Sequence, residues 1–239
     1  MIDKQLSFHH PLNLDTPPAS WTVVFLNQIS LLVQPGFASG KHNLEGIGVP
    51  HLRPMNVDRE GKIDLAVVKS VVGENNIQLE IGDVLFNNTN SSELVGKTAL
   101  ISSREYGFAF SNHMTQVRLI DGLCASFIAK QIHFLWMSGY LKYRCTHHVN
   151  QASISSKTLA DTVPLLFPPI HEQTRIVDKL EQILSDLEAG VAELKAAQKK
   201  LTQYRQSLLK AAVEGRLTAE WRARRPLSPN PSPTRGEQL

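Results

Sequence analysis

Residues 168–220 read PPIHEQTRIVDKLEQILSDLEAGVAELKAAQKKLTQYRQSLLKAAVEGRLTAE. Apolar residues recur there in alternating steps of four and three, and this heptad seam predicts a coiled-coil helix rather than an ordinary surface helix. Pro168 and Pro169 prevent the helix from starting earlier, and Gly215 is placed to end it. Residues 171–214 would form a rod about 66 Å long. The seam consists of Ile176, Leu180, Ile183, Leu187, Gly190, Leu194, Ala197, Leu201, Tyr204, Leu208 and Ala211.

An apolar seam on a long helix has to be buried, and no comparable pattern precedes residue 168. The sequence therefore predicts that another chain covers the seam, most simply in an antiparallel pair of rods. A second apolar row, at Val177, Leu184 and Val191, widens the first half of the rod, which we expect to pack against the preceding domain as well. The residues expected at the partner interface are Ile176, Leu180, Ile183, Leu187, Leu194, Leu201, Tyr204 and Leu208.

Both ends of this helix resemble a known family. Residues 168–177, PPIHEQTRIV, resemble the PPxxEQxxIV signature of type I restriction–modification specificity subunits, and residues 204–218, YRQSLLKAAVEGRLT, resemble a second signature of that family. Upstream, residues 81–91, IGDVLFNNTNS, followed by Gly96 and Lys97, are similar to the GDxLF segment of its target recognition domains. The resemblance covers about residues 18–222. It implies a DNA-reading domain followed by a spacer helix that holds methyltransferase subunits.

The resemblance also implies where the chemistry lies. This chain would carry no cofactor and would be no enzyme. Methyl transfer with S-adenosylmethionine would belong to an adenine methyltransferase (modification) subunit, and cleavage with ATP and Mg to a restriction subunit. The family usually has two recognition domains and two spacer helices, whereas this chain has one of each. We therefore expect a half-length subunit that forms a homodimer or pairs with another half-subunit, or a truncated remnant.

Composition and charge narrow the class of protein. The 239 residues have room for one medium domain and an extended element, and residues 1–170 hold 13 basic and 13 acidic residues. This balance does not by itself indicate a DNA-binding protein, so either the basic groups cluster on one face or a partner supplies phosphate contacts. Without an apolar run of about 18 residues or an N-terminal signal core, we expect a cytoplasmic protein that binds no membrane.

The residues before the rod predict an α+β domain with a mixed α/β sheet. β-prone segments bounded by turns are typical of strands, and the apolar spacing of residues 124–137 favours a helix. The expected organisation is a lead-in at 1–18, a recognition domain at 19–168, the spacer helix at 169–222 and a disordered tail at 223–239. Strands are expected at residues 21–26, 49–53, 63–72, 77–81, 84–86 and 114–120.

Seven polar residues are candidate DNA contacts. Asparagine reads adenine edges and arginine reads guanine, which makes Arg53, Asn56, Asn87, Asn88 and Asn90 the candidate base readers. Lys97 and Lys157 are the candidate phosphate contacts. Each also has a structural alternative: asparagine favours turns, and exposed arginine and lysine form ion pairs or solvated loops.

No constellation of catalytic or metal-binding residues is visible in the sequence. Cys145, His147 and His148 are close together but lack the spacing of a zinc site, and Cys124 with Cys145 forms no CxxC pair. No adenine methyltransferase motif or paired carboxylates of a nuclease occur. Two other classes stay open: the recognition fragment of a DNA nuclease or fused methyltransferase, and a coiled-coil adaptor without a role on DNA.

Overall fold

A computed structural model describes residues 10–39, 41–72, 77–149 and 151–224 of the chain. It divides into two compact units, with the boundary between Lys179 and Leu180 inside the longest helix. The first unit is a domain of mixed sheets and helices, so the expected α+β class is confirmed. Residues 1–9 of the expected lead-in and residues 225–239 of the expected tail lie outside the described residues.

A four-stranded antiparallel sheet lies at the centre of the domain. Its strands follow the order β2 (Ser30–Pro35), β10 (Met114–Leu119), β6 (Val84–Asn87) and β8 (Thr98–Leu100). Successive side chains of a strand point to opposite faces. In β6, Val84 and Phe86 accordingly enter one apolar core while Leu85 enters another. The sheet is therefore buried on both faces.

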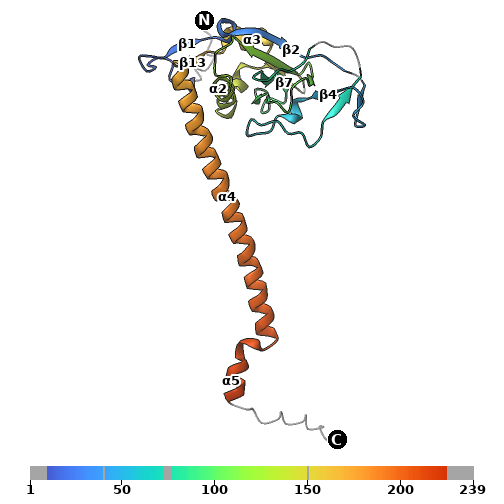
Figure 1. Ribbon diagram of the computed structural model, residues 1–239, viewed down its shortest axis with the longest axis vertical. Coiled ribbons are helices and arrows are strands. Elements are labelled where there is room, and N and C mark those ends of the chain that lie inside the picture. The colour runs from blue at the N-terminus through green and yellow to red at the C-terminus, as the bar shows by residue number, and fades with distance from the viewer. Residues whose placement is uncertain (1–9, 40, 73–76, 150, 225–239) are drawn as a thin grey trace. The chain divides into compact units, whose positions relative to one another are not determined.

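Helices cover the first face. The helix α2 (Ala125–Met137) buries Ile128, Ile132 and Leu135, whose spacing of four and three places them on one stripe. The short helices α1 (Leu26–Ile29) and α3 (Ser156–Thr162) complete this core. Two strands from opposite ends of the domain, β1 (Thr22–Val24) and β13 (Leu165–Phe167), pair antiparallel and lie side by side in Figure 1.

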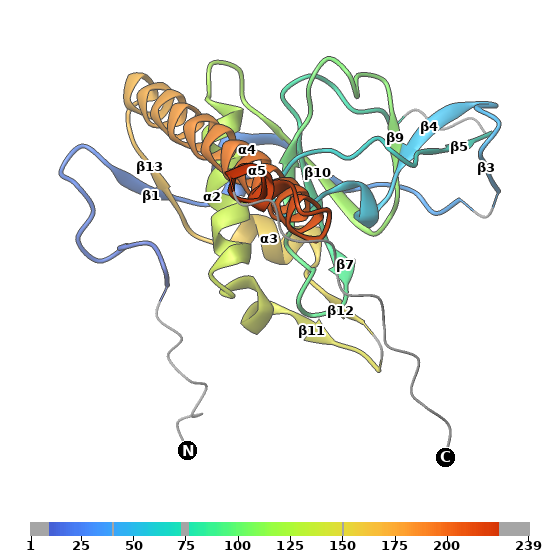
Figure 2. The same ribbon diagram turned by 90° about the horizontal axis from the view of Figure 1, so that it is seen from below.

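A second sheet covers the other face. Its order is β3 (His42–Asn43), β5 (Lys69–Val71), β4 (Val49–Leu52) and β9 (Ala109–Phe110), and only the pair β4–β9 is parallel. Leu52 and Phe110 of this sheet pack with Leu85 and Met114 in the second core. Figure 2 shows α2 on one side of β10, and β4 and β9 on the other.

Small elements complete the domain. A third sheet has the order β11 (Thr146–His147), β12 (Ala152–Ser153) and β7 (Thr89–Asn90). Two 3₁₀ turns, η1 (Pro54–Asn56) and η2 (Leu141–Arg144), follow β4 and α2. Strands were expected at residues 63–72 and 77–81; only Lys69–Val71 forms one in the first segment, and the second expectation is wrong. Leu79 instead makes two isolated backbone hydrogen bonds with the 107–108 segment.

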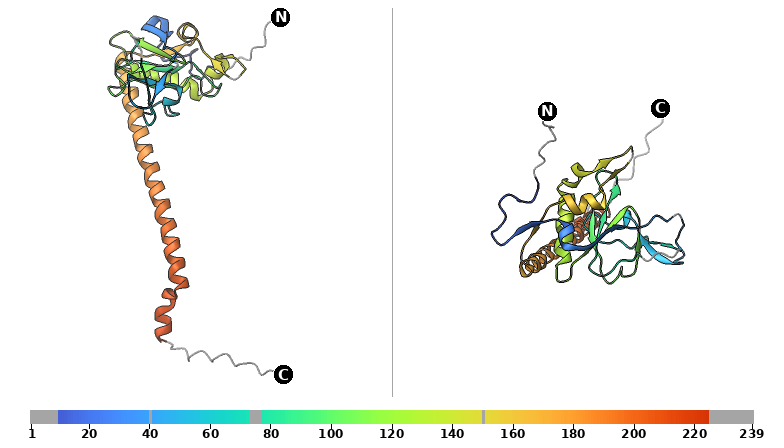
Figure 3. Two further views of the ribbon diagram at one scale, coloured as in Figure 1. Left: turned by 90° about the vertical axis from the view of Figure 1, so that its right-hand side faces the viewer. Right: turned by 90° about the horizontal axis from the view of Figure 1, so that it is seen from above.

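The predicted long helix is confirmed as α4 (Ile170–Val213), a single unbroken helix (Figure 3). Gln173 donates from Nε2 to the carbonyl oxygen of Pro168 at 2.8 Å, and Glu172 accepts from Trp21 Nε1 at 3.0 Å. Gly215, at φ 72°, ends the helix as expected, because glycine adopts this left-handed conformation without strain. The 3₁₀ turn η3 (Arg216–Thr218) and the helix α5 (Ala219–Arg224) follow.

The second apolar row of α4 is only partly covered by the domain. The apolar residue Val177 is 7% exposed and belongs to the first core, so the start of α4 packs against the domain as expected. Leu184 and Val191 of the same row are 48% and 40% exposed, so the packing expected for the first half of the rod is limited to its first turns.

Within the described ranges, no helix is both long and apolar enough to cross a membrane.

Candidate nucleic-acid interface

Several candidate DNA contacts face inward onto one loop, residues 53–68. Asn56 is 2% exposed and donates from Nδ2 to the carbonyl oxygens of Asp64 and Val67, both at 2.9 Å. Its Oδ1 accepts the backbone N–H of Arg53 at 3.0 Å. Asn56 thus closes the loop on itself. A direct contact between its amide and a base would require these bonds to break.

The same loop is attached to the central sheet by buried side chains. Asn87 donates from Nδ2 to the carbonyl oxygen of Pro54 at 3.0 Å, and Lys97 donates from Nζ to that of Val57. Burial lowers the pKa of Lys97, while the charge of Asp58 opposes this shift. From α2, the Nε2 of His133 lies 3.1 Å from the carbonyl oxygen of Arg59. The backbone of the loop is therefore held in place from β6, from the residue before β8 and from α2.

Asn88 is also engaged inside the domain. Its Nδ2 donates to the carbonyl oxygen of Asn112 at 3.1 Å and to Thr115 Oγ1 at 3.0 Å. Its Oδ1 accepts the hydroxyl of Thr89 at 2.7 Å. The amide of Asn88, the residue after β6, is therefore bonded to β10. Base reading by Asn56, Asn87 and Asn88 stays a prediction, and so does phosphate contact by Lys97.

The other three candidates are accessible. Arg53 is partly exposed, and its Nη2 lies 3.3 Å from the sulfur of Met55. Asn90, also partly exposed, lies on β7 opposite Ala152 of β12, the strand that precedes α3. Lys157 is exposed in the first turn of α3. The structure thus separates the seven candidates into four buried side chains and three accessible ones.

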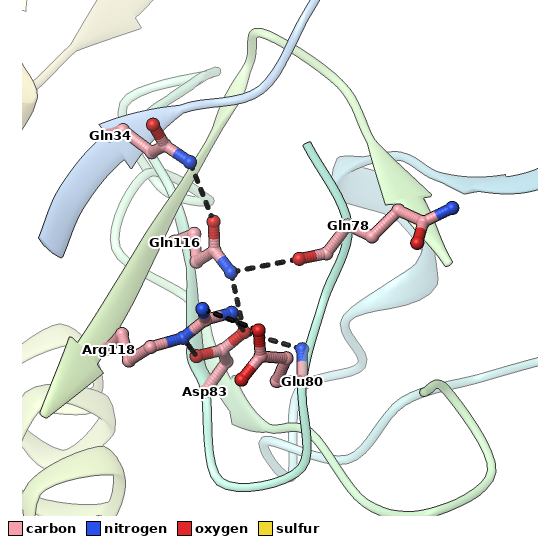
Figure 4. A network of polar contacts seen from close by, with 6 residues as sticks. All are labelled: Gln34, Gln78, Glu80, Asp83, Gln116 and Arg118. Atoms are coloured by element: carbon pink, nitrogen blue, oxygen red, sulfur yellow. Dashed lines mark hydrogen bonds and ion pairs between the residues drawn. The ribbon is translucent and has the colours of Figure 1, made fainter. Parts of the chain in front are cut away.

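A polar network that the sequence did not indicate lies at the edge of the second core. Asp83 is 1% exposed and accepts from Nε and Nη2 of Arg118 at 2.9 Å each. Gln116 donates to the same carboxylate at 2.5 Å and accepts from Gln34 Nε2 at 3.0 Å, as Figure 4 shows. The hydrogen bond to Asp83 raises the pKa of Arg118 further above its ordinary range. The aspartate of the GDxLF segment therefore anchors β10.

This network borders a hollow of about 200 Å³. Glu80 contacts Arg118 at 2.7 Å, so two carboxylates surround one guanidinium. Since the local charge is negative, the hollow does not favour a phosphate. The period-two spacing of Gln116 and Arg118, which places both side chains on one face of β10, is the sequence signal that could have indicated this network. The hollow is lined by Leu32, Gln34, Ile77, Gln78, Leu79, Glu80, Tyr106, Gly107, Gln116 and Arg118.

Cys145, His147 and His148 were considered as metal ligands in the sequence, and the structure shows their surroundings. Burial raises the pKa of the Cys145 thiol, and its Sγ lies 3.2 Å from the carbonyl oxygen of Leu141. In the part of the chain that the structure describes, no group of three or more His, Cys, Asp or Glu side chains is arranged to hold a metal ion. His147 and His148 are exposed.

The expected interface residues lie along α4. Ile176 packs against the first core, whereas the remaining seven are exposed in this chain, from 38% at Leu208 to 72% at Leu194. Gly190 has no heavy atom within 4 Å of where a Cβ would be, so nothing in the described chain requires glycine there. The exposed seam residues are Leu180, Ile183, Leu187, Leu194, Leu201, Tyr204 and Leu208.

Comparison with known families agrees with the signatures. Residues 18–196 match the family model of the type I restriction modification DNA specificity domain. That match covers the domain and the first part of α4. The chain therefore belongs to the family of type I restriction–modification specificity subunits.

Individual relatives support the same family and fold. The chain is 31% identical over 196 residues to the type I restriction enzyme EcoKI specificity subunit of Escherichia coli K12, covering 79% of this chain and 41% of that protein. It is 27% identical to the putative type I restriction enzyme MjaX specificity subunit of Methanocaldococcus jannaschii, covering 81% and 45%. The chain thus spans less than half the length of these relatives.

Two solved structures share the fold. One, from work on complex assembly and conformational transition of the type I R-M system, has a TM-score of 0.65 at 20% identity and covers 85% of this chain and 48% of that one. The other is the HsdS subunit from Thermoanaerobacter tengcongensis, with a TM-score of 0.57 at 24% identity, covering 85% and 47%.

Proposed function

We propose that the chain is the DNA-reading subunit of a type I restriction–modification complex. Its domain would read one half-site of an interrupted target, and α4 would dock methyltransferase subunits. The observation that carries this proposal is the family match over residues 18–196, with the PPxxEQxxIV signature at the start of α4. In that signature Glu172 and Gln173 make hydrogen bonds that fix the start of the helix on the domain.

In this proposal the start of α4 and the rest of the helix have different roles. Its first turns, up to Lys179, belong to the domain, while the seam from Leu180 onward exposes large apolar side chains. Such a continuous exposed stripe is typical of an interaction surface, because removing apolar side chains from water on binding lowers the free energy. Its partner is a second copy of this chain, another half-length subunit or a modification subunit, and the complex also includes a restriction subunit.

The chemistry is assigned to the partners. Methyl transfer would use S-adenosylmethionine held by the modification subunit, and cleavage would use ATP and Mg held by the restriction subunit. This chain would contribute target choice and orientation. In the domain, Arg53, Asn90 and Lys157 can contact DNA directly, whereas Asn56, Asn87, Asn88 and Lys97 would act through the backbone that they hold.

A methylation assay tests the proposal. Duplex DNA is incubated with labelled S-adenosylmethionine and with this chain, the modification subunit, or both. Methyl transfer is expected only with both proteins present. Transfer by this chain alone would show that it is an enzyme. A modification subunit that methylates equally well without this chain would contradict the assigned role in target choice.

The seam is tested separately. Replacing Leu187 and Leu194 together with aspartate places two charges on the seam, which opposes burial against a partner. Light scattering should then report a smaller mass, with unchanged circular dichroism. The matched control is Ser185→Asp with Ala192→Asp, which adds the same charges at the same spacing on the opposite side of the helix. Equal masses for the unsubstituted protein and the seam variant would exclude the seam as the interface.

A further inference from the structure

The face of the second sheet that points away from the second core gathers cationic and ionisable side chains, and His51 and Val71 on this face are buried. In the register of this sheet, His51 of β4 lies opposite Lys69 of β5, and His42 of β3 lies opposite Val71 of β5. Because side chains alternate between faces, His42, His51 and Lys69 share one face. Leu52, the neighbour of His51, points the other way and enters the second core.

Arg53 adds a further cation to the face shared by His42, His51 and Lys69. Its backbone is extended, with φ −130° and ψ 166°, so its side chain lies on the same face as that of His51. The Nε2 of His42 lies 3.3 Å from the Nδ1 of His51, and the ring of Phe37 packs edge-on against His51 at 5.1 Å between centroids. His51 is only 1% exposed. The two imidazoles are thus fixed relative to each other.

No acidic group balances this face among the residues described. Neither Arg53 nor Lys69 forms an ion pair there, and the Nε of Arg53 is buried without a hydrogen-bond partner. Burial lowers the pKa of His42, and the charges of Arg53 and Lys69 lower it further. The pKa of His51 falls to about 4, mainly through burial and then through His42 and Arg53.

Cations held together without a counter-charge repel each other, and a bound anion removes that repulsion. Arginine presents a planar set of donors that matches phosphate oxygens, and lysine binds phosphate as a point charge. We infer that this face of the second sheet binds a phosphate of the DNA backbone, with Arg53, Lys69 and His42 as its contacts. This rests on the proposed function, and it assigns Arg53 to phosphate rather than to a base.

The polar hollow near Arg118 gives the contrasting case. There Asp83 and Glu80 already surround the guanidinium, so a phosphate would meet net negative charge. The face around Arg53 has no such partners in the described ranges. Of these two polar surfaces of the domain, only the second sheet thus offers cations to DNA.

The first test measures the salt dependence of binding to a random-sequence duplex by fluorescence anisotropy, with the full chain. Neutralising one phosphate contact lowers the slope of log affinity against log salt by about one unit. Lys69→Gln, which keeps most of the stem, should show this loss. Lys142→Gln on η2, which removes the same charge from another part of the domain, should not. Equal slopes for Lys69→Gln and the unsubstituted protein would overturn the inference while leaving the proposed function intact.

The second test does not depend on DNA. Nuclear magnetic resonance of the histidine rings measures the pKa of His42 with and without inorganic phosphate. Bound phosphate should raise this pKa, because it offsets the charges of Arg53 and Lys69. Lys69→Gln should raise the pKa without phosphate and weaken the phosphate effect. An unchanged pKa of His42 at saturating phosphate would overturn the inference, even if the chain bound no duplex by itself.

Discussion

Val177 and Leu194 lie on the same helix, yet one is 7% exposed and the other 72%. The first belongs to the domain, whose two cores are closed by its own sheets and helices. The second belongs to the unit that begins at Leu180, where the large apolar side chains stay on the surface. The domain therefore closes its own cores, whereas the seam leaves apolar side chains exposed for the association proposed above.

The largest effect should separate these two positions. Val177→Asp places an unpaired charge in the first core and should destabilise the domain by about 4 kcal/mol. Leu194→Asp, the same kind of change on the exposed seam, should leave the stability of the domain within about 0.5 kcal/mol. Urea unfolding followed by tryptophan fluorescence measures both, since Trp21 contacts the start of α4 through Glu172. Equal destabilisation by the two changes would contradict the assignment of Val177 to the domain core and of Leu194 to the exposed seam.

A second comparison concerns two carboxylates that contact Arg118. Asp83→Ala removes the buried carboxylate that accepts from Gln116 and from Nε and Nη2 of Arg118, which should cost about 3 kcal/mol. Glu80→Ala removes a partner whose side chain is 58% exposed and should cost less than about 1 kcal/mol. Thermal unfolding of both variants measures the difference. A larger loss for Glu80→Ala would show that the network has another anchor.

The helix could be predicted from sequence, because a heptad pattern and the residues that bound a helix are local signals. The expected range 171–214 and the observed Ile170–Val213 differ by one residue at each end. The packing of Val177 was also expected, since it widens the apolar stripe. The bond between Trp21 and Glu172 could not be predicted, because it joins residues 151 positions apart.

A third prediction uses pH. The pKa of His51 falls to about 4 in the folded domain, against 6.5 ordinarily. Between these values the unfolded chain binds the proton and the folded chain does not, so stability falls as pH falls from 6.5 to about 4. The loss should reach about 2–3 kcal/mol. His51→Phe should flatten this part of the profile, while the same change at exposed His147 should not. Parallel profiles for His51→Phe and the unsubstituted domain would refute the burial effect.

The sequence alone could not show which of the candidate asparagines are accessible to DNA. Asn88 and Asn90 are two residues apart and equally typical of a turn or of a base contact. In the structure, Asn88, the residue after β6, is bonded to β10 inside the domain, and Asn90 is accessible on β7. Accessibility depends on the pairing of β6 with β10, which is a long-range contact.

The smallest expected effect compares these accessible residues. Asn90→Ala should weaken binding of the preferred sequence by about 1–3 kcal/mol and relax preference at one base position. Lys157→Ala should weaken all sequences alike and lower the salt slope by about one unit. Competition binding with duplexes substituted at single positions separates the two outcomes. Asn90→Ala with an unchanged preference at every position would remove it from the base readers.

Selection from a randomised duplex library tests the central claim most directly. The chain is mixed with its modification subunit, and the bound duplexes are sequenced. Two short fixed blocks separated by a non-specific spacer are expected, because paired rods of about 66 Å span roughly two turns of B-DNA. A single uninterrupted block, or no enriched sequence, would contradict the account of a domain that reads a half-site and a helix that sets the spacing.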